Sequence, residues 1–172
     1  DGIGGFPLAG VRQGFTPVWA SEIEPFPIQV TKLRFPEMLH VGDITRLKGA
    51  ELTPVDVVCG GSPCQDLSVA NGRRAGLQGE RSGLFMEQVR VIKEMRAYDK
   101  ASGRTADAVR PRYMVWENVP GVLSSNRGKD FGSFLGMLGE LWYGFSYRVL
   151  DAQYFGVAQR RRRVFVVVDF GG

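Results

Sequence analysis

Six short apolar runs alternate along the chain with longer segments of helical periodicity. The apolar runs have the length of β-strands and cover residues 17–20, 38–41, 55–59, 112–116, 147–150 and 164–168. Apolar side chains also recur every three or four positions at Phe85, Val89, Ile92 and Met95, and at Phe131, Phe134, Leu135, Leu138 and Trp142. Strands that alternate with amphipathic helices predict an α/β fold, with a mainly parallel sheet covered by helices on both faces.

The chain has the size and composition of one globular domain. It contains 172 residues, of which 44% are hydrophobic, and we find no internal repeat and no linker. We therefore expect a single catalytic or cofactor-binding domain over residues 1–172. No window approaches the roughly 20 unbroken apolar residues of a membrane-spanning helix, so no membrane partner is expected.

Charge and cysteine content narrow the chemistry only in part. Lysine and arginine exceed aspartate and glutamate by 22 to 18, and residues 160–163 are all arginine. Arginine suits phosphates and base edges, although a net charge of +4 also fits an ordinary solvated surface. His40 is the one histidine beside Cys59 and Cys64, so neither a zinc site nor a disulfide framework is expected.

Two polar segments are long for loops inside a compact domain. Residues 65–82 follow a central strand and are rich in glycine and arginine. Because open α/β sheets bind ligands at strand ends, we expect a moving active-site loop there. Residues 98–110 are polar as well, and we expect a disposable surface loop.

Glycines and acids at successive strand ends suggest a nucleoside cofactor. Gly2, Gly4 and Gly5 form an opening turn, Glu22 follows the first predicted strand and Asp43 the second. Glycine lets a ligand approach the backbone, and an acid at this distance can bind ribose hydroxyls. A tight structural turn would explain the glycines equally well.

Cys64 and Glu117 are candidates for covalent and acid chemistry. Cys64 lies just beyond the third strand, and a thiol is the most nucleophilic side chain available without strong activation. No histidine is placed to serve as its base, so its electrophile should need little base assistance. Glu117 ends the strand at 112–116, where partial burial would favour the protonated acid. Cys59, inside its strand, is interpreted as a small core residue.

The run Gln159–Arg163 leads into the last strand. In an extended strand Gln159, Arg161 and Arg163 would share one face, which could line a pocket. A basic run that meets solvent or phosphate is the alternative.

Taken in order, these strings resemble the cytosine-C5 DNA methyltransferases over nearly the whole chain. Pro63-Cys64-Gln65, Glu117-Asn118-Val119 and Gln159-x-Arg161-x-Arg163 stand in the order of that family, after the turn at residues 2–6. The resemblance implies a Rossmann-like S-adenosylmethionine-dependent fold. It also implies the catalytic front half of such an enzyme, incomplete at both ends and without a target-recognition domain.

The resemblance also implies a mechanism. The thiolate of Cys64 would add to carbon 6 of a flipped-out cytosine and make carbon 5 nucleophilic toward the methyl group of S-adenosylmethionine. Glu117 would bind the exocyclic amine and N3, Arg163 would bind the carbonyl oxygen, and Arg161 would support the site. Activation of the ring by these groups would explain a cysteine without a histidine.

The cofactor contacts carry over in the same way. The opening turn would meet the methionine part of S-adenosylmethionine and Glu22 the ribose. Ile23 and Ile44 would pack on the adenine, and Asp43 would accept from its amine. Pro63 and Leu84 would shape the far wall. The full set of implied cofactor residues is Gly2, Ile3, Gly4, Gly5, Phe6, Glu22, Ile23, Asp43, Ile44, Pro63 and Leu84.

Double-stranded DNA is the implied partner. The loop at residues 65–82 would close over the duplex and offset the cost of base flipping through phosphate and groove contacts. The implied DNA-binding residues are Gln65, Ser68, Arg73, Arg74 and Gln159. We expect a monomer without metal in the cytoplasm or nucleoid of a bacterial or phage-infected cell, in a restriction-modification, orphan or phage role.

Three other functions stay open. The same constellation could methylate a tRNA cytosine, although Gln65 after the cysteine fits the DNA enzymes. A non-catalytic module that binds S-adenosylmethionine or DNA is possible for a partial chain. A cysteine hydrolase is disfavoured because no general base is evident.

Overall fold

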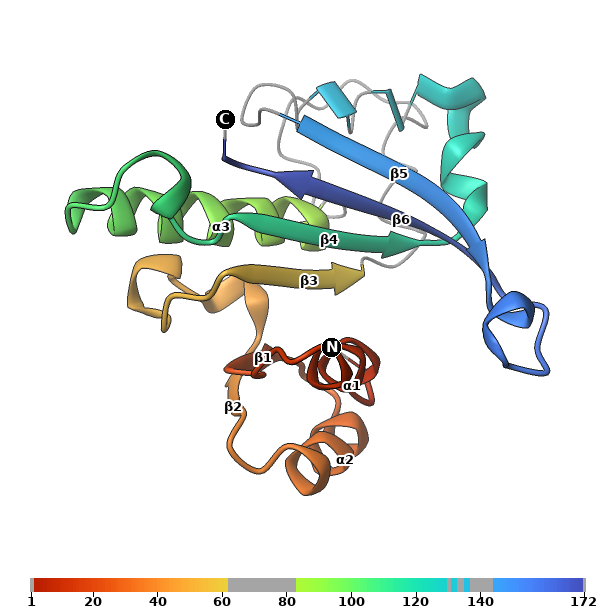
Figure 1. Cartoon of the computed structure of the whole chain (residues 1–172), viewed down its shortest axis with the longest axis horizontal. Helices are drawn as coiled ribbons and strands as arrows, with labels where there is room; N and C mark the ends of the chain where they lie inside the picture. Colours follow the sequence, from red (N-terminus) through yellow and green to blue (C-terminus); the bar gives the residue numbers. More distant parts are fainter. Residues whose placement is uncertain (1, 62–82, 130, 133–134, 137–143, 172) are drawn as a thin grey trace.

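The computed structural model describes residues 2–61, 83–129, 131–132, 135–136 and 144–171. Two sheets make up the frame of the molecule (Figure 1). A two-stranded sheet lies near the N-terminus beside the short helices α1 and α2. A four-stranded sheet carries the long helix α3.

All six predicted strands form, with ends shifted by a few residues. The small sheet pairs β1 (Trp19–Ser21) with β2 (Leu39–Gly42) in parallel. The larger sheet has the order β3-β4-β6-β5 and contains β3 (Val57–Gly61), β4 (Tyr113–Asn118), β5 (Gly144–Asp151) and β6 (Arg162–Asp169). β3 runs parallel to β4, whereas β6 is antiparallel to both β4 and β5. The reversal follows from the short connection at residues 152–161, which can join only antiparallel neighbours.

Within the described ranges, α-helices and a series of short 3-10 turns connect the strands. The helices are α1 (Gly5–Arg12), α2 (Pro25–Arg34) and α3 (Gly83–Ala101). The 3-10 turns are η1 (Ile44–Arg46), η2 (Gly49–Glu51), η4 (Ala106–Ala108), η5 (Pro120–Leu123), η6 (Ser125–Gly128) and η7 (Ala152–Phe155). The predicted helix at 131–142 falls mostly outside the described residues, although Phe131 is buried and Leu135 packs against the core.

The core lies between α3 and one face of the larger sheet. The predicted apolar stripe on α3, from Phe85 to Met95, is buried. It meets alternate side chains of β4 and β6, among them Trp116 and Val166, both with 0% exposure. The rings of Phe85 and Trp116 meet edge to face, with centroids 5.9 Å apart. This packing holds the end of β4, where Glu117 is located, against a rigid layer.

The expectation of a disposable surface loop at residues 98–110 is right only in part: residues 100–108 are exposed, but Asp99 and Val109 are buried. α3 continues to Ala101, and the side chain of Asp99 is 3% exposed. Its carboxylate accepts hydrogen bonds from the Arg110 amide (2.8 Å) and from Arg110 Nη2 (3.1 Å), and Arg104 lies 3.6 Å away. Val109 is also buried. The polar residues of this segment therefore close around one carboxylate and tie the end of α3 to the start of β4.

We expect Asp99→Asn to lower the free energy of unfolding by about 3 kcal/mol at pH 7, because it leaves Arg110 without its anion. Burial alone would raise the pKa of Asp99, but hydrogen bonds from Arg110 outweigh it and hold the pKa below the ordinary value. A depressed pKa stabilises the fold above the unfolded pKa and loses that effect as the pH falls through the folded pKa. Urea unfolding should therefore show the difference between variant and parent narrowing below about pH 4.

Asp107→Asn is the control for this prediction. Asp107 belongs to the same segment, but its side chain is 58% exposed and lies 3.8 Å from Arg112. Its loss should cost no more than about 0.5 kcal/mol. Equal effects of the two substitutions would contradict the assignment of Asp99 as the buried anchor.

The described residues contain neither a membrane-spanning helix nor a metal-binding cluster. None of the helices in the described ranges is long and apolar enough to cross a membrane. No group of three or more histidine, cysteine, aspartate or glutamate side chains in those ranges is arranged to hold a metal ion.

Candidate active site

The acids Glu22 and Asp43 lie at one edge of the small sheet. β1 and β2 end at the pair Ser21 and Gly42, and Ser21 Oγ donates a hydrogen bond of 2.7 Å to the Gly42 carbonyl. Glu22 and Asp43 each follow directly. The parallel pairing therefore brings together two acids that are 21 residues apart in the sequence.

Glu22 connects the glycine turn to the end of β1. Its Oε2 accepts a hydrogen bond from the Gly2 amide (2.8 Å), and its Oε1 accepts from the amides of Ile23 (2.9 Å) and Glu24 (3.1 Å). Burial alone would raise the pKa of Glu22, but these backbone hydrogen bonds outweigh it and lower the pKa to about 2. Glu22 is therefore a fixed anion beside the opening turn.

The glycine turn has a structural requirement of its own. Gly2 and Gly4 have φ values of +63° and +86°, which side chains rarely adopt, and Gly4 forms the N-cap of α1. A Cβ atom on Gly4 would also lie 2.9 Å from the Phe35 ring and 3.0 Å from the Thr31 methyl group. The tight-turn explanation thus holds for both glycines through their backbone conformation, and Gly4 is also crowded, whereas no atom would lie within 4 Å of a Cβ on Gly2.

Asp43 caps the short turn η1 that follows β2. Its Oδ1 accepts hydrogen bonds from the amide (2.9 Å) and the hydroxyl (2.8 Å) of Thr45. These two hydrogen bonds lower the pKa of Asp43. The carboxylate is therefore ionised and fixed in direction, with Oδ2 turned to neither of these donors.

Apolar residues stand next to the glycine turn and the two acids in the sequence, and Leu84 was expected to join them. Ile3 is 60% exposed and Ile23 is 65% exposed, whereas Ile44 is partly buried against the core. Leu84, in the first turn of α3, is 39% exposed. Gly5 begins α1, and Phe6 is half-buried in its first turn. Exposed isoleucines next to oriented carboxylates suit a ligand with a flat apolar ring and polar edges.

Glu117 and Arg163 form an ion pair in the four-stranded sheet, between the end of β4 and the start of β6. Arg163 Nε lies 2.9 Å from Glu117 Oε1, and the two side chains are 23% and 26% exposed. Glu117 is the residue before the last of β4 and Arg163 is the second of β6, so the antiparallel pairing places them together. Gly61 is the last described residue before the segment with Cys64. A Cβ atom on Gly61 would lie only 2.9 Å from Glu117 Oε2.

A cavity of about 270 Å³ opens over this ion pair. Its lining consists of Glu117, Leu150, Ala152, Phe155, Arg161, Arg163 and Phe165. Three charged groups thus face a pocket with otherwise apolar walls. Sequence reasoning missed the apolar wall. Phe165 continues the alternation of Arg161 and Arg163 and could have been found. Leu150 comes from the pairing of β5 with β6 and Phe155 from the turn η7 between them, which the strand pattern does not predict.

The arginine run is extended only in its last part. β6 begins at Arg162, and Arg161, just before it, donates its amide to Asp151 Oδ1 at 3.0 Å. Arg161 and Arg163 nevertheless line the same cavity, as expected. Gln159 lies in a turn, with its amide on the Val157 carbonyl at 2.8 Å, and is absent from the lining. Alternation along a strand therefore does not extend back to Gln159.

The remaining predicted residues divide into two groups. Pro63, Cys64, Gln65, Ser68, Arg73 and Arg74 lie outside the described residues. Cys59 is described and does not belong to the packed core, since the residue is exposed, although burial around its thiol raises the pKa of Cys59 to about 11. It follows the buried Val58 on the strand and therefore points to the face of β3 away from α3.

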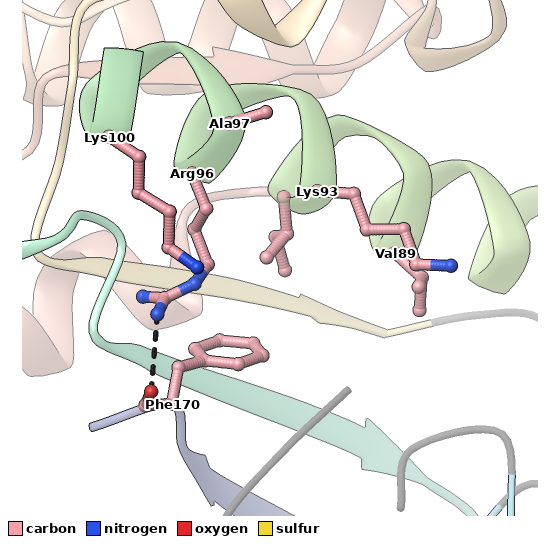
Figure 2. Close-up of a pocket in the computed structure, with 7 residues that line it drawn as sticks. Val89, Lys93, Arg96, Ala97, Lys100 and Phe170 are labelled. Atoms are coloured by element: carbon pink, nitrogen blue, oxygen red, sulfur yellow. Dashed lines mark hydrogen bonds between the residues drawn. The ribbon is translucent and has the colours of Figure 1, made fainter. Parts of the chain in front are cut away.

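A second cavity, of about 230 Å³, lies between α3 and Phe170 (Figure 2). Arg96, Lys93 and Lys100 line this cavity from α3, and Phe170 lines it from below in the view of Figure 2. The guanidinium of Arg96 lies 5.0 Å from the centre of the Phe170 ring and donates to the carbonyls of Val109 (2.9 Å) and Phe170 (3.1 Å). Arg96 is therefore bound into the fold, and this cavity is separate from the one at Glu117.

Comparisons with known proteins point to DNA methyltransferases. The family model for C-5 cytosine-specific DNA methylase matches residues 1–168. The chain is 38% identical to a DNA N-6-adenine-methyltransferase of Escherichia phage P1, over 98% of this chain and 28% of that protein. It is 37% identical to the type II methyltransferase M2.BsuMI of Bacillus subtilis, over 98% of this chain and 40% of that protein.

A solved structure shows the same fold. It is a prophage-encoded protein of E. coli, described as a DNA modification methyltransferase. It superposes with a TM-score of 0.71 at 25% identity, over 98% of this chain and 44% of the other. The chain thus spans less than half the length of these relatives. With a family model that matches nearly every residue, the chain belongs to the C-5 cytosine-specific DNA methylase family.

Proposed function

We propose that the protein containing this chain transfers a methyl group from S-adenosylmethionine to carbon 5 of a cytosine in double-stranded DNA, with Cys64 as the nucleophile. The observation that carries the proposal is the Glu117–Arg163 pair inside a cavity of about 270 Å³ beside Gly61.

The pair suits the edge of a flipped-out cytosine. That edge presents an amine, the ring nitrogen N3 and a carbonyl oxygen in succession. A carboxyl group can accept from the amine and hold a proton at N3, and a guanidinium can donate to the carbonyl oxygen. The apolar walls from Phe155 and Phe165 offer surfaces for the ring.

The acidic edge of the small sheet suits the cofactor. Asp43, fixed by Thr45, can accept from an adenine amine, and Glu22 stands where a ribose would follow. Ile3 and Ile23 provide exposed apolar contacts for the base and the methionine part. When bound, S-adenosylmethionine supplies a methyl group on positively charged sulfur, which carbon 5 can take up to leave a neutral thioether.

Cys64 performs the covalent step. Its thiolate forms a bond to carbon 6, and the electron pair of the 5,6 double bond becomes available at carbon 5. The charge on the ring is offset by the proton that Glu117 holds at N3. After transfer, water takes up the carbon 5 proton, the electron pair of that C–H bond restores the 5,6 double bond, the bond from carbon 6 to sulfur breaks to release the thiolate, and N3 returns its proton to Glu117. Addition to such a ring needs no histidine base, which agrees with the sequence.

Adenine and a tRNA cytosine are the two alternative substrates. The phage P1 relative is named for adenine N6, a reaction at an exocyclic amine that needs no thiol. A tRNA cytosine would use the same cysteine and differ only in the nucleic acid. We favour DNA because the matching family model describes a DNA methylase.

The experiment is covalent trapping on DNA duplexes of diverse sequence in which cytosine is replaced by 5-fluorocytosine. Fluorine cannot leave as the carbon 5 proton does, so the enzyme should remain bound as an adduct on a denaturing gel when S-adenosylmethionine is present. Peptide mapping by mass spectrometry should place the modified base on Cys64.

Two controls make the result decisive. Duplexes with ordinary cytosine should release the protein, and omission of S-adenosylmethionine should prevent stable trapping. An adduct only on tRNA that carries the same analogue would move the substrate to RNA. No adduct on either nucleic acid, with intact cofactor binding, would identify a binding module instead.

A further inference from the structure

Arg90, on the second turn of α3, makes four hydrogen bonds and one further ion-pair contact through its guanidinium. Nε donates to Glu87 Oε2 at 2.7 Å, and Nη2 lies 2.6 Å from the same oxygen. Nη1 donates to Glu94 Oε1 and to the Leu47 carbonyl, both at 2.8 Å. Nη2 also donates to the Ile44 carbonyl at 3.1 Å. A guanidinium has five donors in a fixed plane, so this side chain has a fully determined position.

The two carbonyls belong to the two ends of η1. Ile44 opens this turn and Leu47 is its C-cap, and neither residue belongs to a strand or an α-helix. Asp43 is the N-cap of the same turn. Arg90, on α3, therefore binds both ends of η1, the short turn that orients the Asp43 carboxylate.

Two glutamates on α3 bind the Arg90 guanidinium, and one of them also binds the backbone of η2. Glu87 and Glu94 stand three residues before and four after Arg90, which places all three on one side of the helix. Glu94 Oε2 also accepts from the Gly49 amide at 2.7 Å, at the start of η2. A Cβ atom on Gly49 would collide with the Val91 carbonyl, so η2 lies directly on α3. Arg90 and Glu94 thus bind residues 44–49 to the helix at three backbone positions.

We propose that Arg90 is a positioning residue for the cofactor: it fixes η1 so that Asp43 and Ile44 meet the adenine. The inference rests on the proposed function, since it takes the adenine end of S-adenosylmethionine as the ligand. Lysine at this position would keep the charge but offers a single nitrogen, which cannot reach two carbonyls and two carboxylates in one plane. The planar guanidinium is needed to bind both carbonyls of η1 at once, and a positive charge alone is insufficient.

Arg96 provides a matched control on the same helix. It also bonds to backbone carbonyls, those of Val109, Pro111 and Phe170, and Figure 2 shows it pointing toward Phe170 at the end of β6. None of these residues belongs to η1 or η2. Arg90→Lys and Arg96→Lys should both lower the thermal midpoint, and only Arg90→Lys should change cofactor binding.

The test is made on the full natural protein that contains this chain. Calorimetric titration with S-adenosylhomocysteine should show affinity about tenfold lower for Arg90→Lys, as expected for the loss of charge-assisted hydrogen bonds. Arg96→Lys should stay within about twofold of the parent. Methyl transfer by Arg90→Lys should show a raised KM for S-adenosylmethionine and a nearly unchanged kcat. Hydrogen exchange without ligand should be faster at residues 43–47 in this variant alone.

Glu87→Gln covers the case in which Arg90→Lys does not fold. It weakens the support of Nε and Nη2 but leaves the arginine in place, so a smaller loss of affinity in the same direction is expected. Equal losses for the Arg90 and Arg96 variants would overturn the positioning role and leave the proposed function intact, as would unchanged affinity of Arg90→Lys or Glu87→Gln. A parent protein that binds no S-adenosylhomocysteine would overturn both.

Discussion

Cys64→Ser should abolish methyl transfer, with a fall in rate of about 10⁴-fold or more, and should leave the affinity for S-adenosylhomocysteine within about twofold. A thiol has a pKa near 8.5 and is a few per cent thiolate at neutral pH. A serine hydroxyl ionises far less and needs a general base. The sequence offers a single histidine, His40, whose Nε2 lies 3.2 Å from Thr31 Oγ1. That contact commits His40 to the packing between α2 and β2.

The measurement combines methyl transfer from labelled S-adenosylmethionine with calorimetric binding on the same preparations. Cys59→Ser is the matched control, because Cys59 is the other cysteine of the chain and lies exposed on β3 before Gly61. It should transfer methyl groups at close to the parent rate. Residual transfer by Cys64→Ser above a hundredth of the parent rate would contradict a covalent mechanism. Full loss in Cys59→Ser would move the nucleophile to that residue.

The fold was predictable where one periodic pattern decided the packing. The stripe of Phe85, Val89, Ile92 and Met95 could be buried only by a helix against an apolar layer, and the runs in β4 and β6 supply that layer. Strand direction was harder, because a valine-rich strand looks alike in parallel and antiparallel pairs. The direction of β6 is set by the short connection from β5, whose length depends on where each strand ends.

Burial of single polar or small residues was the least predictable feature. Asp99 stands in a run of polar residues, and only the convergence of Arg104 and Arg110 on it makes a buried carboxylate favourable. Cys59 shows the opposite case, because period-two alternation assigns it to one face without showing which face is covered.

The candidate site was predictable as a set of strand ends. Glu22, Asp43 and Glu117 were expected there because open sheets collect ligands at that edge, and the described strands place each of them at a strand end. The supporting contacts were not expected. The hydrogen bond from Gly2 to Glu22 joins residues 20 positions apart, and those from Arg90 to Leu47 and Ile44 join residues 43 and 46 positions apart. No local sequence pattern specifies such distant partners.

The second large effect is expected at Glu117. Glu117→Gln should lower kcat for methyl transfer by about 10²- to 10⁴-fold, the usual contribution of a positioned acid, with little change in the KM for S-adenosylmethionine. A glutamine keeps the size of the side chain and can still accept from the cytosine amine. It has no proton to give to N3, so the charge that develops when the thiolate adds to carbon 6 would remain uncompensated.

Structural damage from this substitution should be small. Arg163 would lose the partner 2.9 Å from its Nε, but its side chain is 23% exposed and also donates from Nη1 to the Arg162 carbonyl at 2.8 Å. A partly hydrated guanidinium does not carry the penalty of a buried unpaired charge. The thermal midpoint should therefore change by only a few degrees.

Glu51→Gln is the matched control, since Glu51 also pairs with a cation at 2.9 Å but is 67% exposed on η2, away from the cavity. It should leave kcat unchanged. Single-turnover assays at saturating cofactor and DNA isolate the chemical step from binding and product release. A Glu117→Gln rate within threefold of the parent would remove the acid from the mechanism. A slow step together with normal DNA and cofactor affinity would place Glu117 at the reacting ring, where the cavity over the Glu117–Arg163 pair can admit a base.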